Sequence, residues 1–233
     1  EVMDKIFDHG SSIEIFSGWN DPLKGPGLFT GIARLKGETV GIIADQPLII
    51  SGAADAAGTE KFRHFMEFLN IRNIPLVMIS NAPGFYPGIK QERLRIQQIG
   101  GESLNVNVTG KIPVVSVVLN QNYGGRQIHA FSRALRPGIV YIAMKNSILS
   151  VMGAGASFDL FQGKKYQALL QTGDTGTASK LKEDYFSEFN NKSSAKNDAM
   201  HTGVLNFLIE DEKLLASNIA NALRIAKEES SKL

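Results

Sequence analysis

The 233-residue sequence predicts an α/β fold with a mostly parallel sheet, because one strand–glycine loop–helix unit occurs twice. In the first unit the apolar stretch 74–80 runs into the glycine loop 81–88, and in the second the stretch 112–119 runs into the loop 120–125. Both stretches are short, rich in β-branched residues and almost entirely apolar, as is typical of parallel strands buried on both faces. If the two units are adjacent, both loops lie at the carboxyl ends of strands, where open α/β proteins bind ligands.

The other elements alternate between strand and helix. In the first half of the chain, periodicity and turn residues predict a hairpin of strands 28–35 and 39–45 and helices over 52–70, 88–108 and 125–135. Strands are predicted next at 140–143 and 147–151, followed by helical sequence beyond residue 163 with a polar loop at 190–194. The chain closes with an apolar segment at 203–209 and an amphipathic helix over 211–229. A chain of this length can bury one large core, so we expect residues 1–233 to form a single domain.

Composition excludes several classes of function. Twenty-five Lys and Arg residues against 23 Asp and Glu residues give a net charge of +2, too balanced to favour a nucleic acid or a membrane surface as partner. The sequence has no cysteine, which excludes a disulfide framework and a thiolate zinc site. His9, His64, His129 and His201 are too far apart for a local metal site, so we expect them on the surface or in local hydrogen bonds. With neither a signal sequence nor an apolar run of membrane length, we expect a soluble, intracellular protein.

The glycine loops themselves are the remaining signatures of chemistry. The sequence has no Gly-x-Ser-x-Gly motif of an α/β-hydrolase, residues 153–158 contain only half of a dinucleotide-binding fingerprint, and residues 163–165 lack the earlier glycine of a P-loop. A glycine loop that leads into a helix presents free backbone N–H groups, which hold an oxyanion without a charged side chain. The alternative is that these glycines only allow tight turns at the ends of strands.

The order of several motifs resembles the carboxyltransferase component of biotin-dependent acyl-CoA carboxylases and decarboxylases. The motifs that carry the resemblance are residues 31–37, 40–47, 61–65, 73–77, 83–88, 112–118, 123–125 and 151–154. The similarity runs from about residue 1 to 162, and residues 203–209 resemble the closing strand of that family. The resemblance implies a crotonase-like (ClpP/crotonase) fold, a spiral of ββα units, and matches the C-terminal half that faces biotin.

The implied activity is carboxyl transfer between N-carboxybiotin and the α-carbon of an acyl-CoA or acyl carrier protein thioester. Biotin would be carried by a partner, the biotin carboxyl carrier protein, and the coenzyme A thioester would be the substrate. Since the site in that family closes between two crotonase-like halves, the resemblance implies an N-terminal-type half or subunit as a further partner, and a homo- or hetero-oligomer of hexameric type. The implied compartment is the cytoplasm, or the mitochondrial matrix or a plastid in a eukaryote.

The resemblance also assigns roles to residues of the two loops. The backbone N–H groups of Gly125 and Arg126 would hold the biotin oxygen as catalytic groups, and Ile128 would border the acyl pocket and influence chain-length preference. A buried helix face is an equal interpretation of Ile128. The residues expected to shape the biotin site are Gly84, Phe85, Tyr123, Gly124, Gly153 and Ala154.

Three positions depart from the family pattern. Asn81 stands where the family usually has aspartate, Arg126 where it has a small residue, and Met144-Lys145 where it has an aromatic–proline pair. With its side chain near biotin, Arg126 would either pair with a substrate carboxylate or block the site. Two further functions therefore stay open: a biotin-independent subunit of malonate-decarboxylase type, which acts on malonyl on an acyl carrier protein, and a non-catalytic structural subunit of a carboxylase assembly.

Overall fold

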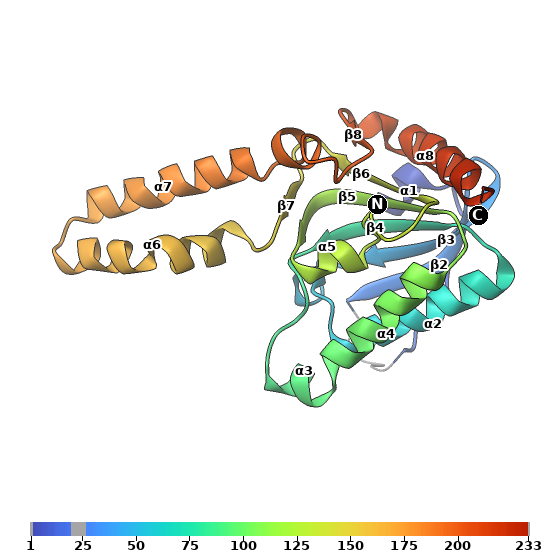
Figure 1. The fold of residues 1–233 in the computed structure, drawn as a ribbon, viewed down its shortest axis with the longest axis horizontal. Helices are drawn as coiled ribbons and strands as arrows, with labels where there is room; N and C mark the ends of the chain where they lie inside the picture. Colours follow the sequence, from blue (N-terminus) through green and yellow to red (C-terminus); the bar gives the residue numbers. More distant parts are fainter. Residues whose placement is uncertain (1, 20–26, 233) are drawn as a thin grey trace.

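The computed structural model describes residues 2–19 and 27–232, and in this part the chain forms an eight-stranded sheet with helices on both faces (Figure 1). The strands are β1 (Ile13–Glu14), β2 (Leu28–Leu35), β3 (Glu38–Asp45), β4 (Leu76–Ala82), β5 (Val114–Tyr123), β6 (Ile139–Met144), β7 (Ile148–Ser150) and β8 (Phe207–Ile209). The α-helices are α1 (Val2–Ile6), α2 (Ala56–Arg72), α3 (Ile89–Arg93), α4 (Ile96–Thr109), α5 (Gly125–His129), α6 (Ala154–Gln171), α7 (Thr175–Lys192) and α8 (Leu215–Ser230). None of the helices in this part is long and apolar enough to cross a membrane.

The sheet is mostly parallel, as the repeated unit predicts. The strands follow the order β1-β2-β3-β4-β5-β6-β8, and β7 pairs with the end of β5. Strands β2 and β3 form the expected antiparallel hairpin, whereas β3, β4, β5, β6 and β8 run parallel. Because β4 and β5 are neighbours, the glycine loops that follow them leave the sheet at the same edge.

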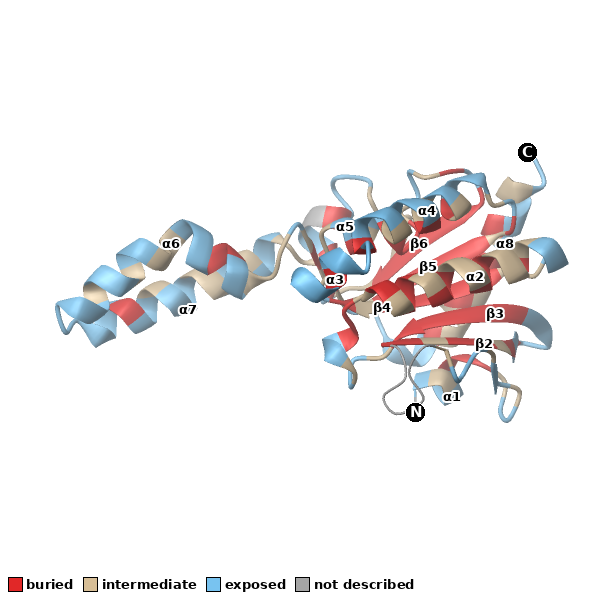
Figure 2. Ribbon diagram, turned by 90° about the horizontal axis from the view of Figure 1, so that it is seen from below, coloured by how far each residue is buried: buried red, intermediate tan, exposed pale blue. Residues whose placement is uncertain are grey.

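Both faces of the central strands are buried, which explains their unbroken apolar sequences. Val77 and Ile79 of β4 belong to the core under α8, and Leu76 and Met78 belong to the core under α2. Helices α1 and α8 cover the first face, and α2 and α4 cover the second (Figures 1 and 2). Alternate side chains of each strand therefore enter opposite cores, and neither face can be polar.

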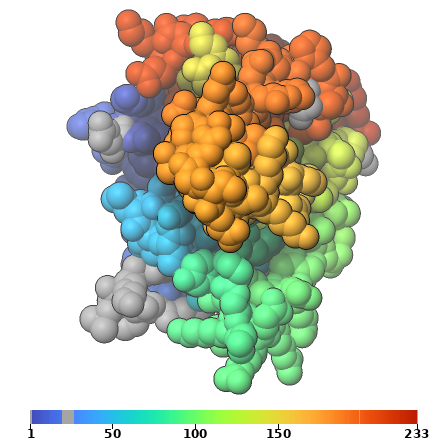
Figure 3. Space-filling model, turned by 90° about the vertical axis from the view of Figure 1, so that its left-hand side faces the viewer, coloured from blue at the N-terminus to red at the C-terminus, as the bar shows by residue number. Residues whose placement is uncertain are grey.

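Helices α6 and α7 form a hairpin that projects from the body of the molecule (Figure 1). The hairpin has a small aromatic cluster of its own, in which Phe158 packs edge-on against Tyr166 and Tyr185. Figure 3 views the molecule from the side toward which the hairpin projects. Much of its surface, including Leu160 and Phe161, is exposed.

Several expected boundaries are wrong. The helical sequence expected beyond residue 163 already begins at Ala154, the start of α6. The helix expected over 125–135 ends at His129, because Phe131 takes a left-handed conformation (φ 66°) that inserts its ring into the core under α2. The helix expected over 88–108 is divided into α3 and α4 at Arg95, which is also left-handed (φ 60°). The polar loop expected at 190–194 begins only after Lys192, where α7 ends.

The packing of α2 on the hairpin gives a first testable prediction. Gly41 of β3 lies so close to Leu69 of α2 that a β-carbon at position 41 would be 2.5 Å from a methyl group of Leu69. Gly41→Ala should therefore destabilise the fold by about 1–3 kcal/mol through overpacking, and Leu69→Ala by about 2–5 kcal/mol through the cavity it leaves. In the double variant the new methyl group occupies part of that cavity. The double variant should therefore lose clearly less free energy of unfolding, measured with urea, than the sum of the losses of the two single variants.

If the losses of free energy of unfolding in Gly41→Ala and Leu69→Ala simply add in the double variant, the contact between these two positions is contradicted. Ile71→Ala is the matched control, since Ile71 lies on the same helix but is 81% exposed. It should change the free energy of unfolding by no more than about 0.5 kcal/mol.

Candidate active site

The two glycine loops meet at the carboxyl edge of the sheet, as the sequence predicts. A β-carbon built at Gly84 would lie 3.9 Å from the carbonyl oxygen of Tyr123, and one built at Gly125 would lie 3.6 Å from the ring of Phe85. The first loop is fixed by Ala54, which donates to the carbonyl of Gly84 at 3.0 Å and accepts from the N–H of Tyr86 at 2.9 Å. The structure therefore brings Gly84, Phe85 and Gly125 together.

The glycines of the two loops have different roles. Gly84 (φ 130°) and Gly124 (φ 58°, ψ −141°) adopt conformations that L-residues rarely take, so the tight-turn interpretation holds for these two. Gly125 is instead the first residue of α5, and Arg126 is the second. The first N–H groups of a helix have no partner within the helix. In the part of the chain that the structure describes, the N–H groups of Gly125 and Arg126 have no acceptor.

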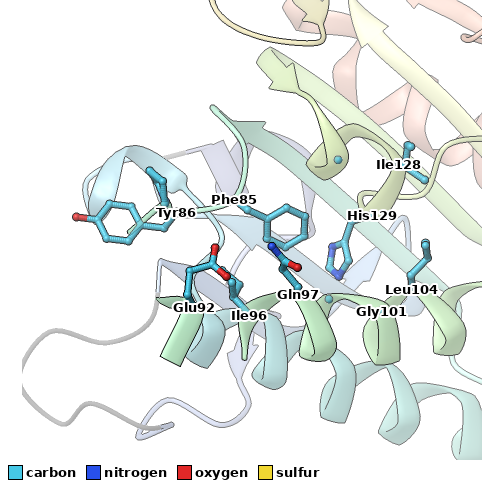
Figure 4. A pocket seen from close by; sticks show the side chains of 12 residues that line it. Phe85, Tyr86, Glu92, Ile96, Gln97, Gly101, Leu104, Ile128 and His129 are labelled. Carbon is cyan, nitrogen blue, oxygen red and sulfur yellow. The ribbon is translucent and has the colours of Figure 1, made fainter. Parts of the chain in front are cut away.

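A cavity of about 510 Å³ lies between the first glycine loop, α4 and α5, and Gly125 is one of its lining residues (Figure 4). Its lining residues are Phe85, Tyr86, Pro87, Glu92, Ile96, Gln97, Gly100, Gly101, Leu104, Gly125, Ile128 and His129. The walls are mainly apolar, and the volume lies within the range of small-molecule sites. Ile128 is 49% exposed and faces this cavity, so the interpretation as a buried helix face is wrong.

The other residues expected at the biotin site lie apart from this cavity. Tyr123 lines a second, polar cavity of about 620 Å³ together with Lys145 and several asparagines. Gly153 packs against the ring of Tyr123, since a β-carbon at Gly153 would lie 3.1 Å from it. Ala154 begins α6 and lines neither cavity. Burial raises the pKa of the Tyr123 hydroxyl, so this side chain stays neutral.

Arg126 corrects the sequence-based expectation, because its side chain points into the core. The guanidinium is 1% exposed and donates from Nη2 to Oδ1 of Asp45 at 2.6 Å. Its Nη1 donates to Nδ1 of His129 at 2.5 Å, and the group lies 5.7 Å from the centroid of the Phe62 ring. Arg126 therefore neither reaches a substrate carboxylate nor blocks the cavity.

His129 is a neutral histidine with a defined tautomer. Arginine can only donate, so Nδ1 of His129 accepts from Arg126, and Nε2 carries the proton that it donates to Oγ of Ser103 at 2.7 Å. Burial, and then the positive charge of Arg126, hold the pKa of His129 well below its ordinary value of 6.5. The ring also packs edge-on against Phe85, with centroids 5.6 Å apart.

The other two departures from the family pattern lie near the same edge. The N–H of Asn81 donates to Asp45 at 2.9 Å, and this backbone contact does not depend on the side chain. Lys145, which follows β6, pairs with Glu210 at 3.4 Å. The sequence alone does not single out Asp45 or Ser103. The local signal for this cluster is the three-residue spacing of Arg126 and His129, which places both on one side of a helix turn.

The chain matches the model of the carboxyl transferase domain over residues 1–232. It belongs to this family. It is 34% identical over 190 residues to the methylmalonyl-CoA carboxyltransferase 12S subunit of Propionibacterium freudenreichii subsp. shermanii, a match that covers 82% of this chain and 35% of that protein. It is also 30% identical over 195 residues to the methylmalonyl-CoA decarboxylase subunit alpha of Propionigenium modestum, covering 84% of this chain and 36% of that protein. The chain thus spans about a third of the length of these carboxyl transferase relatives.

Solved structures confirm the crotonase-like fold. The transcarboxylase 12S hexamer, with methylmalonyl-coenzyme A and methylmalonic acid bound, matches with a TM-score of 0.83 and 28% identity over 98% of this chain and 41% of that one. The beta subunit of Pseudomonas aeruginosa geranyl-CoA carboxylase matches with a TM-score of 0.78 over 99% of this chain and 41% of that one, and at 18% identity it supports the fold alone.

The buried neutral state of His129 predicts a pH dependence of stability. Because its pKa is lower in the folded than in the unfolded chain, the unfolded chain binds the extra proton below pH 6.5. The contribution of neutral His129 to the free energy of unfolding is thus fully present above pH 6.5. It is lost as the pH falls, by up to about 1.4 kcal/mol per pH unit. Chemical unfolding between pH 7 and pH 5 should show this slope.

His129→Gln should be less stable at pH 7 and should lose this part of the slope. His9→Gln is the control, since His9 is exposed, and it should keep the slope of the unmodified chain. Equal slopes in the unmodified chain and His129→Gln would contradict the assignment of a neutral histidine.

Proposed function

We propose that this chain is the biotin-side half of a carboxyltransferase, which moves a carboxyl group between N-carboxybiotin and the α-carbon of an acyl-CoA thioester. The observation that carries the proposal is the pair of unpartnered N–H groups of Gly125 and Arg126 at the start of α5, where Gly125 lines an apolar cavity at the edge at which both glycine loops meet. Membership of the carboxyl transferase family supports it. Backbone donors of this kind stabilise the negative charge that develops on an oxygen during acyl or carboxyl transfer.

The residues present fit a biotin ring system. Its ureido oxygen is an acceptor on a neutral ring and needs donors rather than a cation, and the Arg126 side chain is turned away from the cavity. The ring of Phe85 and the side chain of Ile128 offer apolar walls to the rest of the group. When bound, N-carboxybiotin supplies the carboxyl group that is transferred.

Each feature of the chain would then have a defined task. The N–H groups of Gly125 and Arg126 donate to the ureido oxygen, and one such donor is typically worth about 2.7–4 kcal/mol of transition-state stabilisation. Phe85 and Ile128 exclude water, which strengthens those hydrogen bonds and protects the labile carboxyl group. Gly84, with φ 130°, lets the first loop make the turn by which it forms the opposite wall.

A partner would complete the site. Large apolar side chains are exposed on segments that follow β3 and β7 at the carboxyl edge and on the projecting hairpin, as Leu48 (93%), Val151 (77%) and Phe161 (67%) show. The relatives are more than twice as long as the matched region. We assign the exposed surface to an N-terminal-type carboxyltransferase half, with a biotin carboxyl carrier protein delivering biotin, in an assembly like the transcarboxylase 12S hexamer.

The comparisons favour this function over the alternatives. Relatives that are 33% identical include the beta4 subunit of a biotin-dependent long-chain acyl-CoA carboxylase from Mycobacterium tuberculosis, which supports a biotin-dependent function. The N–H of Gly125, which has no acceptor in the described part of the chain and lies at the cavity, is available to a ligand, as a catalytic subunit requires.

The oxyanion role can be tested by removing one donor. Gly125→Pro deletes an N–H at the first position of α5, where a helix tolerates proline. In the assembled enzyme it should lower the rate of carboxyl transfer by about a hundredfold or more if the donor is used. Thr175→Pro places proline at the first position of α7, at the tip of the hairpin, and should leave the rate unchanged.

Steady-state kinetics with N-carboxybiotin and an acyl-CoA provide the measurement. The result counts only if the melting temperature and the assembly of Gly125→Pro match those of the control. A folded Gly125→Pro enzyme with a normal rate would remove the backbone oxyanion role.

The partner surface gives a separate prediction. Leu48→Asp and Phe161→Asp place a charge on a surface that becomes dry on association, so each should weaken binding of an N-terminal-type half by at least about tenfold in sedimentation. Ile71→Asp changes an equally exposed side chain at the end of α2 and should have no effect. Unaltered association of all three variants would place the partner elsewhere.

A further inference from the structure

A buried polar network joins the two glycine loops through side chains. It consists of Ser103 of α4, His129 and Arg126 of α5, Asp45 at the end of β3, and Ser80 near the end of β4. All five side chains lie beneath the surface. The network thus connects four separate elements at the edge of the sheet where the candidate site lies.

Asp45 ties the network to the first glycine loop. Its Oδ2 accepts from the backbone N–H of Asn81 at 2.9 Å and from Oγ of Ser80 at 3.1 Å, while Oδ1 accepts from Arg126 at 2.6 Å. Asn81 is the penultimate residue of β4, just before the first glycine loop leaves the sheet. One carboxylate therefore holds the start of the first loop and the second residue of α5 at a fixed separation.

Arg126 ties the network to the second loop. Helix α5 has only five residues, too few to be stable without tertiary contacts. The guanidinium bonds Asp45 on one side and His129 on the other, and His129 continues to Ser103 of α4. The short helix is therefore held to β3 by the side chain of Arg126 and to α4 by that of His129.

Energetics make this arrangement specific. Taking a guanidinium and a carboxylate out of water is costly, and the cost is recovered only where both are paired and hydrogen-bonded. If α5 shifted relative to β3, the guanidinium of Arg126 would lose its hydrogen bonds, so the ion pair with Asp45 favours one placement of the helix. The N–H group of Arg126 belongs to the same residue as the buried guanidinium, so anchoring the side chain also anchors this donor and its neighbour, Gly125.

We propose that the side chain of Arg126 is a positioning residue, which through Asp45 holds the N–H groups of Gly125 and Arg126 in register with the first glycine loop. The inference rests on the proposed function for its catalytic consequence, but its structural content is independent of it. The guanidinium does not contact the reacting groups and acts only through α5.

Hydrogen exchange tests the structural part directly. Arg126→Met and Asp45→Asn each remove the ion pair, and exchange of the hydrogen-bonded amides within residues 81–88 and 127–130 should rise by about tenfold or more in both variants. The double variant should resemble either single variant, because each change already breaks the same link. Arg126→Lys keeps a cation that can pair with Asp45, so its exchange should lie closer to that of the unmodified chain.

Arg136→Met is the matched control. Arg136 is also a buried arginine, but it donates to the backbone carbonyls of Asn107 and Ile112 and bonds neither Asp45 nor His129. Because the side chain of Asn107 donates to the carbonyl of His129 at 2.9 Å, this control also tests whether the loss of any buried arginine near α4 loosens α5. Loss of the Arg136 side chain should lower the melting temperature without raising exchange in the two loops. Loop exchange that stays unchanged in Arg126→Met and Asp45→Asn, or that rises equally in Arg136→Met, would overturn the proposal.

Kinetics of the assembled enzyme test the catalytic part. Arg126→Met should lower kcat by about 10- to 100-fold, since small misplacements of catalytic groups have effects of this size, while KM for the acyl-CoA changes by less than about threefold. Arg126→Lys should recover part of kcat, and Arg136→Met should keep it. A normal kcat in Arg126→Met together with faster amide exchange in the loops would overturn the catalytic consequence. Normal amide exchange in this variant would overturn the positioning role itself.

The two proposals can fail separately. If the unmodified assembly transfers no carboxyl group, the proposed function fails. The exchange experiments then still decide whether Arg126 positions α5. If the assembly is active and Arg126→Met behaves like the unmodified chain in both experiments, the positioning role of Arg126 fails and the proposed function stands. Should Arg126→Met not fold, Asp45→Asn and Arg126→Lys provide the same comparison.

Discussion

The parallel pairing of β4 and β5 is the constraint on which the rest of the structure depends. The pairing runs from Leu76 opposite Val114 to Ser80 opposite Val118, and it directs both strands to the same edge of the sheet. Since each strand is buried on both faces, a slip of one residue would bring Ser80 or Ser116 to a new position against the wrong core. The two glycine loops therefore meet as a consequence of core packing, and the candidate site needs no separate element to bring them together.

Buried cations show how the fold adapts to polar groups. Arg126 pairs with a carboxylate, whereas Lys61 and Arg136 mainly bond backbone carbonyls. Nζ of Lys61 donates to the carbonyl of Leu28 at 3.0 Å and lies 3.7 Å from Glu14, and burial lowers its pKa. Burial likewise lowers the pKa of Arg136 to about 10. In each case one long side chain satisfies groups of elements that are distant in the sequence, and so joins those elements.

The sequence predicts those features that depend on local pattern. The apolar runs and glycine loops at residues 74–88 and 112–125 predict strands, turns and a shared edge, and these are confirmed. The helix expected over 125–135 is wrong because the position of Phe131 in the core depends on helix α2 rather than on its sequence neighbours. The orientation of Arg126 is missed for a similar reason: its partner, Asp45, is 81 residues away in the chain. Periodicity contains no information about which distant carboxylate a buried arginine will find.

Backbone polar groups near the two ends of the central strands differ in whether the chain satisfies them, and this contrast supports the proposed site. At the amino end, Arg136 donates to the carbonyls of Asn107 and Ile112, so the chain satisfies its own backbone acceptors there. At the carboxyl end, the N–H groups of Gly125 and Arg126 remain without an acceptor in the described part of the chain, although a carboxylate, Asp45, lies near enough to bind the Arg126 side chain. If Asp45 accepted from those N–H groups instead, α5 would be satisfied but could not bind an oxyanion. By pairing the carboxylate with the guanidinium beneath the helix, the fold neutralises the charge and leaves the backbone donors available to a ligand.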